Sequence, residues 1–299
     1  VTWVPVRRRN VAMVYQEFIN YPSLTVYDNI ASPLKLAGLE RAEIDRRVRA
    51  EAERLHIEAL LGRLPGELSG GQQQRTAMAR ALVRDAELLL LDEPLINLDY
   101  KLREELRVEL REIFRERNAV IVYATTEPLE ALTLGGRTAV LHEGRLVQEG
   151  ATPEVYRRPA TVAVSQVFSD PPMNLVRGRL EGETLVLGRD VRLAPPPHLA
   201  ALPAGEYQLG VRPPHVFVYR HAERDIAVTG EVEVAEISGS ETYIHMHHNE
   251  VAWVVQEEGV HGFELGEPIT VYMHPGHLFA FDLEGNLLAA PAQQRRAAA

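Results

Sequence analysis

The sequence predicts an α/β domain followed by a smaller all-β domain. Up to about residue 158, short apolar runs alternate with segments of helical spacing, a pattern typical of strands and helices in turn. Beyond Asp170-Pro171-Pro172 the chain changes to short β-rich runs that glycine and proline interrupt, which indicates a small barrel or sandwich. The length of 299 residues suits two such domains.

The elements of the first domain follow from the periodicity of apolar residues. A run of consecutive apolar residues between turn signals predicts a buried strand, and apolar positions three or four apart predict a helix packed on the core. On this basis we expect a strand at 11–15, helices from a Thr25 cap to about 36, at 42–56 and at 72–83, a strand at 88–91, a helix at 101–116, a strand at 119–124, and a hairpin at 138–149.

The second domain is expected to contain strands at 208–211, 216–219, 230–237, 242–247, 251–255 and 269–273. We place the α/β domain at 1–158, a linker at 159–175, the β-domain at 176–290 and a disordered tail at 291–299.

Composition narrows the function classes. The chain has no cysteine, so disulfides and cysteine-bound metals are excluded. From Ala160 to the end, 9 Arg or Lys residues stand against 18 Asp or Glu residues, an excess of negative charge that disfavours nucleic acid as a partner. No apolar run approaches the length that crosses a bilayer, and these features together suggest the cytoplasm.

The segment Leu68–Arg75, with the sequence LSGGQQQR, places a serine and two glycines at a helix start. Glycine lets the backbone approach a ligand, and the free N–H groups and dipole of a helix start favour phosphate. The hydroxyl of Ser69 can add a donor. Taken alone, the segment is also explained by an ordinary capped helix.

The segment Leu88–Pro94, with the sequence LLLLDEP, is an apolar strand that ends in two acids. The first, Asp92, can hold Mg²⁺ beside a nucleotide, and the second, Glu93, can orient or deprotonate an attacking water. In isolation the same letters would fit a buried strand that leaves the core through charged residues.

The two segments together resemble the signature and Walker B motifs of ATP-binding-cassette (ABC) ATPases. Gln16, after Val14-Tyr15, resembles the Q-loop glutamine, which touches Mg²⁺ and the attacking water, and Asn97-Leu98-Asp99 resembles the D-loop. Four motifs in this order make a chance match improbable. The resemblance covers nearly the whole chain and implies an ATPase that uses ATP and Mg²⁺.

ABC ATPases work as head-to-tail dimers, in which the signature motif of one subunit completes the nucleotide site of the other. The resemblance therefore implies a catalytic set, a nucleotide-binding set and a metal set. They are Glu93, Gln16 and Thr126 for catalysis; Ser69, Gly70, Gly71, Gln72 and Asp99 for the nucleotide; and Asp92 and Gln16 for the metal.

The sequence departs from the family pattern in one loop. It contains no Gly-x-x-x-x-Gly-Lys-Ser/Thr, the Walker A loop that wraps the phosphates, and only 15 residues precede Gln16. We therefore expect an ABC ATPase domain that lacks its Walker A segment, as in a fragment of a longer reading frame.

The second departure concerns one residue of the site. The family usually carries Thr-His-Asp-Gln after the strand at 120–123, whereas this chain has Thr125-Thr126-Glu127-Pro128. Thr126 stands where the family has its switch histidine. A hydroxyl can hydrogen-bond to phosphate or water but cannot carry a proton charge near neutral pH. Weak hydrolysis at its own site is expected.

The β-domain resembles the OB-like regulatory domain of maltose- and glycerol-phosphate-type importer ATPases, through LGVRP at 209–213 and EISGSETY at 236–243. The segments VYQEFINYP at 14–22 and YATTEP at 123–128 resemble one of the two ATPases of the rhizobial-type glycerol importer. This implies uptake of a small polyol or carbohydrate, with glycerol favoured. It also implies a different ATPase as dimer partner, transmembrane permease subunits, an indirect periplasmic solute-binding protein, and a peripheral place on the cytoplasmic face of the inner membrane.

Two other functions remain open at this stage. A non-transport ABC ATPase acting on nucleic acid or ribosomes usually has two cassettes or basic insertions, which this acidic chain does not show. A non-catalytic subunit that only donates its signature motif to a partner is the stronger alternative.

Overall fold

The computed structural model describes residues 3–5 and 9–292, and the chain folds as two compact units, residues 1–134 and 135–299. The division precedes the limit at 158 that composition suggested, because the hairpin after residue 135 pairs with itself and packs on later helices. The domain bounds 1–158, 159–175, 176–290 and 291–299 stay predictions, and residues 293–299 of the tail lie outside the described part.

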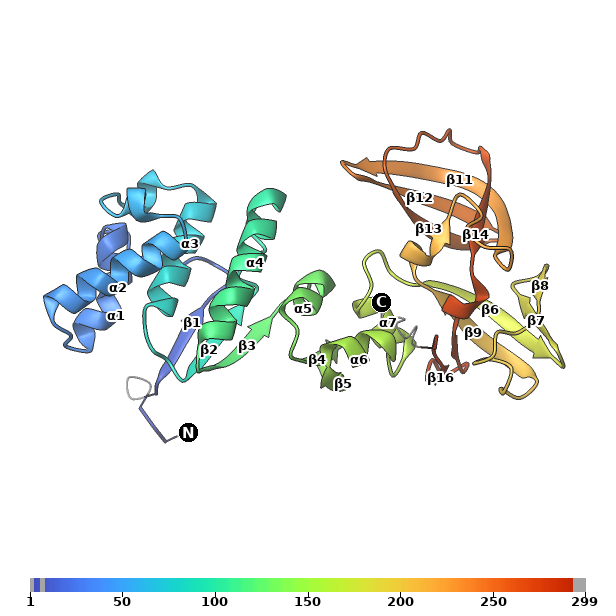
Figure 1. The fold of residues 1–299 in the computed structure, drawn as a ribbon, viewed down its shortest axis with the longest axis horizontal. Coiled ribbons are helices and arrows are strands. Elements are labelled where there is room, and N and C mark those ends of the chain that lie inside the picture. The colour runs from blue at the N-terminus through green and yellow to red at the C-terminus, as the bar shows by residue number, and fades with distance from the viewer. Residues whose placement is uncertain (1–2, 6–8, 293–299) are drawn as a thin grey trace, which may run out of the picture. The chain divides into compact units, whose positions relative to one another are not determined.

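Three strands form the parallel sheet of the first unit: β1 (Val11–Val14), β2 (Leu88–Asp92) and β3 (Val120–Ala124), in the order β1-β2-β3 (Figure 1). Val14 pairs with Leu91, and Leu91 pairs with Tyr123. Parallel strands end at the same edge, so the residues that follow all three strands meet there.

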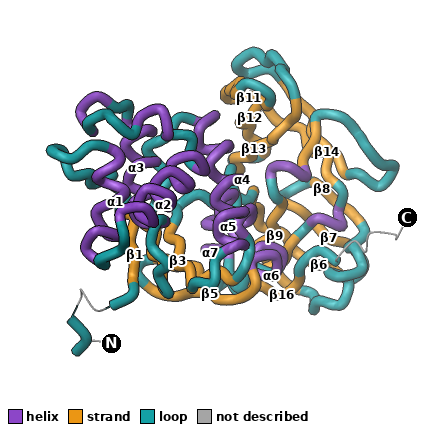
Figure 2. Tube along the Cα trace, turned by 60° about the vertical axis from the view of Figure 1, so that its left-hand side comes forward, coloured by secondary structure: helices purple, strands orange, loops and turns teal. Residues whose placement is uncertain are grey.

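Four helices lie between these strands in the sequence, and a fifth follows β3: α1 (Val26–Leu36), α2 (Arg41–Arg54), α3 (Gly70–Leu82), α4 (Tyr100–Glu116) and α5 (Pro128–Leu134). Thr25 caps α1, since its side chain accepts a hydrogen bond from the Asp28 N–H, as the sequence predicted. The helices α1, α2 and α3 lie beside one another in the helical part of this unit (Figure 2, where all helices are purple). Short 3-10 turns at Glu58–Leu60 and Pro65–Glu67 connect α2 to α3.

The core of the first unit lies on one face of the sheet. Residues on that face, such as Leu89 and Leu91, join a buried cluster with α1 to α4. On the opposite face Val120 and Val122 stay 65% and 52% exposed, and Met13 is 37% exposed. One face of this sheet is therefore bare within the described residues, although parallel sheets are usually covered on both sides.

The second unit begins with the hairpin of β4 (Arg137–His142) and β5 (Arg145–Ala151), whose turn is Glu143-Gly144 as expected. The helices α6 (Thr152–Arg157) and α7 (Val162–Val167) follow. Arg212 is buried against this segment, because it donates hydrogen bonds to the carbonyls of Tyr156 and Phe168 and stacks over the Tyr156 ring at 3.9 Å.

Two antiparallel sheets complete the second unit, in the orders β10-β14-β11-β12-β13 and β16-β15-β9-β6-β7-β8. The Asn174 amide on β6 joins the two sheets, since it donates to and accepts from the backbone of Val254 on β13. Residues of both sheets share one core around Trp253 and Leu209. The bounds are β6 Asn174–Glu181, β7 Thr184–Leu187, β8 Val191–Leu193, β9 Gly205–Val211, β10 Val216–Phe217, β11 Ile226–Ser238, β12 Glu241–His248, β13 Val251–Glu258, β14 Pro268–Met273, β15 Phe279–Phe281 and β16 Leu287–Ala289, with 3-10 turns at Pro213–His215 and Pro275–His277.

This architecture confirms the predicted fold class, an α/β domain with a helical part followed by an all-β domain. Among the helices that the structure describes, none combines the length and apolarity that a membrane span needs.

Candidate functional site

The carboxyl edge of the β1-β2-β3 sheet gathers the predicted catalytic and metal residues. Gln16 follows β1, Asp92 is the last residue of β2, Glu93 comes next, and Thr126 follows β3. The side chains of Gln16, Asp92 and Thr126 belong to exposed residues, and Glu93 is partly buried. The structure therefore collects residues from three separated segments at one accessible edge.

Glu93 turns sharply out of the strand. Its φ of 43° lies in the left-handed region, which costs a non-glycine residue about 1 kcal/mol or more. The turn is held because the Glu93 N–H donates to the Ala124 carbonyl at 2.9 Å. The Thr126 hydroxyl donates to the Glu93 carboxylate across 3.4 Å. This contact joins the proposed base to the residue at the switch position.

The predicted D-loop lies beside the Q-loop. The Asn97 side-chain amide donates to the backbone carbonyl of Gln16 at 3.0 Å. Asp99 caps α4, since its carboxylate accepts from the Leu102 N–H at 3.0 Å. Asp99 thus has a structural role in this structure, and its nucleotide role stays a prediction.

The signature residues open α3 and bond to each other. The Ser69 oxygen accepts from the Gln72 N–H at 3.4 Å, and the Gln72 side-chain oxygen accepts from the Ser69 N–H at 3.1 Å, which is a capping box. Ser69 and Gly70 are exposed. In the described part of the chain, no hydrogen bond joins these side chains to Asp92 or Glu93.

Gly71 has a packing reason for being glycine. A Cβ atom at this position would lie 2.6 Å from a methyl carbon of Leu102 and 3.2 Å from one of Leu98. The start of α3 therefore packs tightly on the beginning of α4. A Cβ atom on Gly70 would meet only the Phe18 ring, at 3.8 Å, so that position leaves room for an approaching ligand.

Sequence reasoning missed the residues that hold the switch segment. The Thr125 hydroxyl donates to the buried Glu130 carboxylate at 2.7 Å and accepts from the Glu127 N–H at 2.9 Å. The Tyr123 hydroxyl also donates to Glu130, and burial together with that carboxylate raises the pKa of Tyr123.

A second anchor of this segment is an ion pair between Arg103 of α4 and Glu127, at 2.7 Å. The two residues lie 24 positions apart in the sequence. The only sequence feature that points to their ion pair is an arginine one turn into a helix that Asp99 caps.

The oxygen donors at the sheet edge fit a magnesium ion. Carboxylate and amide oxygens are the ligands that Mg²⁺ takes in nucleotide sites, and Asp92 and Gln16 present one of each. Asp92 ends its strand exposed, with no ion pair to a basic side chain within the described residues. These two residues could hold the metal.

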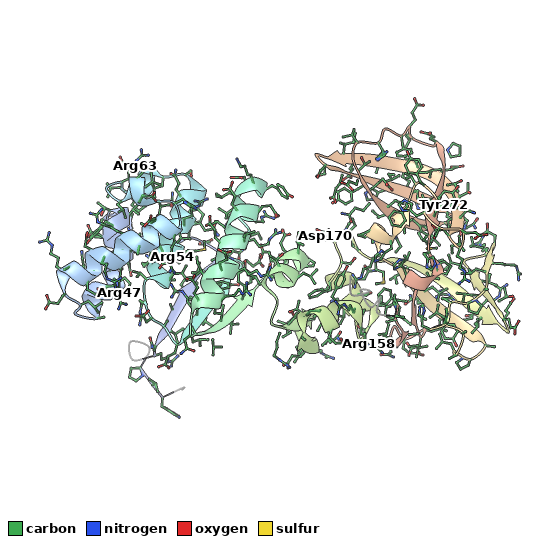
Figure 3. The ribbon with its side chains drawn as sticks, viewed as in Figure 1. Arg47, Arg54, Arg63, Arg158, Asp170 and Tyr272 are labelled. Carbon is green, nitrogen blue, oxygen red and sulfur yellow. The ribbon has the colours of Figure 1, made fainter. Side chains whose placement is uncertain are left out.

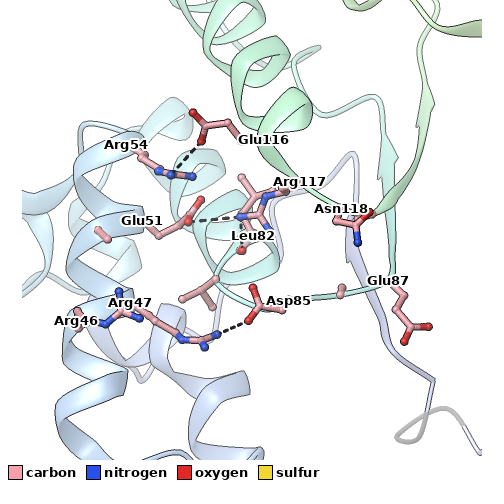
Figure 4. Close-up of a pocket in the computed structure, with 14 residues that line it drawn as sticks. Arg46, Arg47, Glu51, Arg54, Leu82, Asp85, Glu87, Glu116, Arg117 and Asn118 are labelled. Atoms are coloured by element: carbon pink, nitrogen blue, oxygen red, sulfur yellow. Dashed lines mark hydrogen bonds and ion pairs between the residues drawn. The ribbon is translucent and has the colours of Figure 1, made fainter.

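A cavity in the first unit lies away from the carboxyl edge of the sheet. It has a volume of about 600 Å³ and lies between α2 and the ends of α3 and α4 (Figure 4). Arg47 and Arg54, which project from α2 in Figure 3, pair with Asp85 and Glu116 across it. Between these pairs Glu51 lies 3.5 Å from Arg117, and burial raises the pKa of Glu51. None of the predicted site residues lines this cavity.

Two different protein-family models match the first and the second part of the chain. A family model described as "ABC transporter" matches residues 2–96, and a model described as "TOBE domain" matches residues 209–281. An ABC transporter ATP-binding protein of Escherichia coli (strain K12) is 35% identical over 94% of this chain and 79% of its own length.

Two further relatives have names that state an import function. The sn-glycerol-3-phosphate import ATP-binding protein of Paraburkholderia xenovorans is 38% identical over 97% of this chain and 79% of its own length. The trehalose/maltose import ATP-binding protein of Thermococcus litoralis is 41% identical over 84% of this chain and 70% of its own length. With the sheet-edge geometry, these matches confirm the predicted family: the chain belongs to the ATP-binding, ATP-hydrolysing subunits of ABC importers.

Proposed function

We propose that Glu93 is the general base of ATP hydrolysis and that Thr126 orients it. The observation that carries this proposal is the 3.4 Å contact between the Thr126 hydroxyl and the Glu93 carboxylate at the edge where β1, β2 and β3 end. Glu93 accepts a proton from the attacking water on the carboxylate oxygen that Thr126 leaves free. The hydroxyl of Thr126 donates to that carboxylate, which keeps it in place but supplies no charge.

Around the base, Asp92 and Gln16 are the residues that would hold Mg²⁺, which when bound supplies positive charge beside the phosphates. Ser69, Gly70, Gly71 and Gln72 present a helix start with exposed donors, which suits a phosphate of the nucleotide held by the facing subunit. Asp99 caps α4 beside them, at the surface that the facing subunit would meet.

We further propose that the facing subunit is a different ABC ATPase. Two copies of this chain would place a hydroxyl at the switch position of both sites, whereas a partner with an imidazole there would provide one stronger site. Mass measurement of the purified transporter tests this. One copy each of two ATPase chains is the expected result, and two copies of this chain would refute it.

The transported solute is proposed to be a small polyol or carbohydrate, with glycerol favoured. Support comes from the two relatives named for sn-glycerol-3-phosphate and for trehalose and maltose import. ATP binding would close the dimer on the cytoplasmic face of the inner membrane, and the permease subunits would bind the segment 18–32 after the Q-loop. The solute-binding protein would act through the permease. Uptake of labelled glycerol, with and without competing glycerol 3-phosphate or maltose, distinguishes these solutes.

The decisive experiment replaces Glu93 with Gln in the assembled transporter. The facing subunit has its own base replaced by glutamine throughout, so that only the site of this chain hydrolyses ATP. In that background the E93Q variant keeps the size of the side chain but cannot accept the proton, so the remaining ATPase activity should fall at least about a hundredfold while ATP still binds. The matched control is E87Q, which should leave activity unchanged. Glu87 immediately precedes the first residue of the same strand, at the end opposite Glu93.

The alternative is a non-catalytic subunit that donates only its signature motif. It would show no ATPase activity above background once the base of the facing subunit is replaced, whether or not Glu93 is changed, but a large loss in the otherwise unaltered transporter when Ser69 is replaced by Arg. That outcome would overturn the role proposed for Glu93.

A further inference from the structure

One guanidinium joins two motifs of the site that are far apart in the sequence. Arg103, one turn into α4, donates from Nη1 to the Glu127 carboxylate at 2.7 Å. Its Nη2 donates to the carbonyls of Ile96 at 3.4 Å and Leu98 at 3.2 Å. Glu127 belongs to the switch segment, and the two carbonyls flank Asn97 of the D-loop.

The surroundings make this arrangement specific to arginine. The side chain of Arg103 is 21% exposed and that of Glu127 is 35% exposed, so the ion pair is partly shielded from water. A guanidinium is planar and presents donors in two directions at once, whereas an ammonium is a single point charge. A lysine could reach Glu127 or the carbonyls, but not both.

Both ends of the link lead directly to the catalytic groups. Glu127 follows Thr126, whose hydroxyl donates to Glu93. At the other end, the Asn97 side chain holds the carbonyl of Gln16. The contacts of Arg103 therefore complete a path that runs from the Q-loop through the D-loop to the switch segment and the base.

We propose that Arg103 is a positioning residue that ties the hydroxyl of Thr126 to the D-loop. Because the link is made to backbone carbonyls at 96 and 98, a displacement of that loop is transmitted to Glu127 and so to Thr126. The link keeps the Thr126 hydroxyl within reach of Glu93 only when the D-loop has the arrangement seen here. This inference rests on the role proposed for Glu93.

The test uses the assembled transporter with the base of the facing subunit replaced by glutamine, so that kcat reports the site of this chain, and three variants of one helix. R103M removes both the ion pair with Glu127 and the hydrogen bonds to the D-loop carbonyls, and keeps the apolar part of the side chain. R103K keeps a charge that can make one of these two sets of contacts. R107M is the control, because Arg107 lies one turn further along α4, is 5% exposed and forms an ion pair with Glu104 of the same helix at 2.8 Å, with no hydrogen bond to the D-loop or to Glu127 among the described residues. The midpoint of thermal unfolding is measured for each.

We expect R103M to lower kcat about three- to fivefold, no more than the loss of the Thr126 hydroxyl itself, and to leave the KM for ATP within about twofold, because a misplaced group affects the reacting geometry more than binding. R103K should stay several-fold low. R107M should lower the unfolding midpoint without lowering kcat. An equal loss of kcat in R107M and R103M would show general damage to α4 and overturn the inference.

A double variant separates positioning from mere stabilisation. If Arg103 acts through Thr126, then T126A should reduce kcat in the wild-type background but change it little in R103M. Effects that multiply, or an unchanged kcat in R103M, would refute the inference. Normal ATPase activity in E93Q would instead refute the proposed base, so the two failures are distinguishable.

Discussion

Replacing Thr126 with His should strengthen the site. In this structure the hydroxyl lies 3.4 Å from the Glu93 carboxylate, at the outer limit of a hydrogen bond, so it contributes about 1 kcal/mol at most. An imidazolium in its place would make a charged hydrogen bond of about 1.5–3 kcal/mol. The gain of about 0.5–2 kcal/mol corresponds to a roughly 2- to 30-fold higher kcat.

Steady-state ATPase measurements check this value on the assembled transporter with the base of the facing subunit replaced by glutamine. They span pH 5.5–8.5, a range of about one unit or more on each side of the usual imidazole pKa of about 6.5. The T126H variant should gain a titration in that range that the wild type lacks, since threonine has no group that titrates there. The control T126A should lose about fivefold or less. An unchanged kcat in T126H would refute the idea that the hydroxyl limits this site.

Three further changes test the packing and charges described above. G71A should lower the free energy of unfolding by about 1–3 kcal/mol in denaturant melts, because its methyl group would lie 2.6 Å from Leu102. Burial and the adjacent His277 lower the pKa of His215 to about 4, so its neutral form stabilises the fold fully above pH 6.5 and this stability is lost as pH falls toward 4. H215F, which keeps a ring for stacking, should show a shallower loss of melting temperature over that range, and an equally steep loss would contradict the assignment. Burial raises the pKa of Glu51, so the contribution of Glu51 to stability is fully present below pH 4.5 and is lost as pH rises through the raised pKa. The melting temperature of E51Q relative to wild type should therefore increase over that interval.

The order and type of most elements followed from local pattern. Thr25 caps a helix because its side chain bonds to an N–H three residues on, a contact that sequence spacing alone predicts. The predicted strand at 230–237 is longer in the structure, beginning at Ile226, because β14 pairs with its first residues. The strands β6 to β8 were missed, since they are held by partners such as β9 that no local signal reveals.

The residues of the site likewise divide into those that the sequence predicts and those that only the structure shows. Asp92, Glu93 and Gln16 could be located because each directly follows or ends an apolar strand, and parallel strands end at one edge. The link from Arg103 to Glu127 could not, because it depends on how α4 lies against a loop 24 residues later. The left-handed φ of Glu93 was also hidden, since nothing in a Glu-Pro sequence marks that conformation.

The capping box at the start of α3 determines which hydrogen-bonding groups of the signature motif are available to a ligand. The Gln72 N–H occupies one of the two acceptor positions of the Ser69 oxygen, so the hydroxyl keeps its O–H donor and a single acceptor position for a ligand. A hydroxyl that already accepts a hydrogen bond is also polarised into a stronger donor. The surface therefore favours ligands that are rich in acceptor oxygens over cations. The same capping contact occurs in many helices. At an exposed helix start it favours the binding of anionic groups.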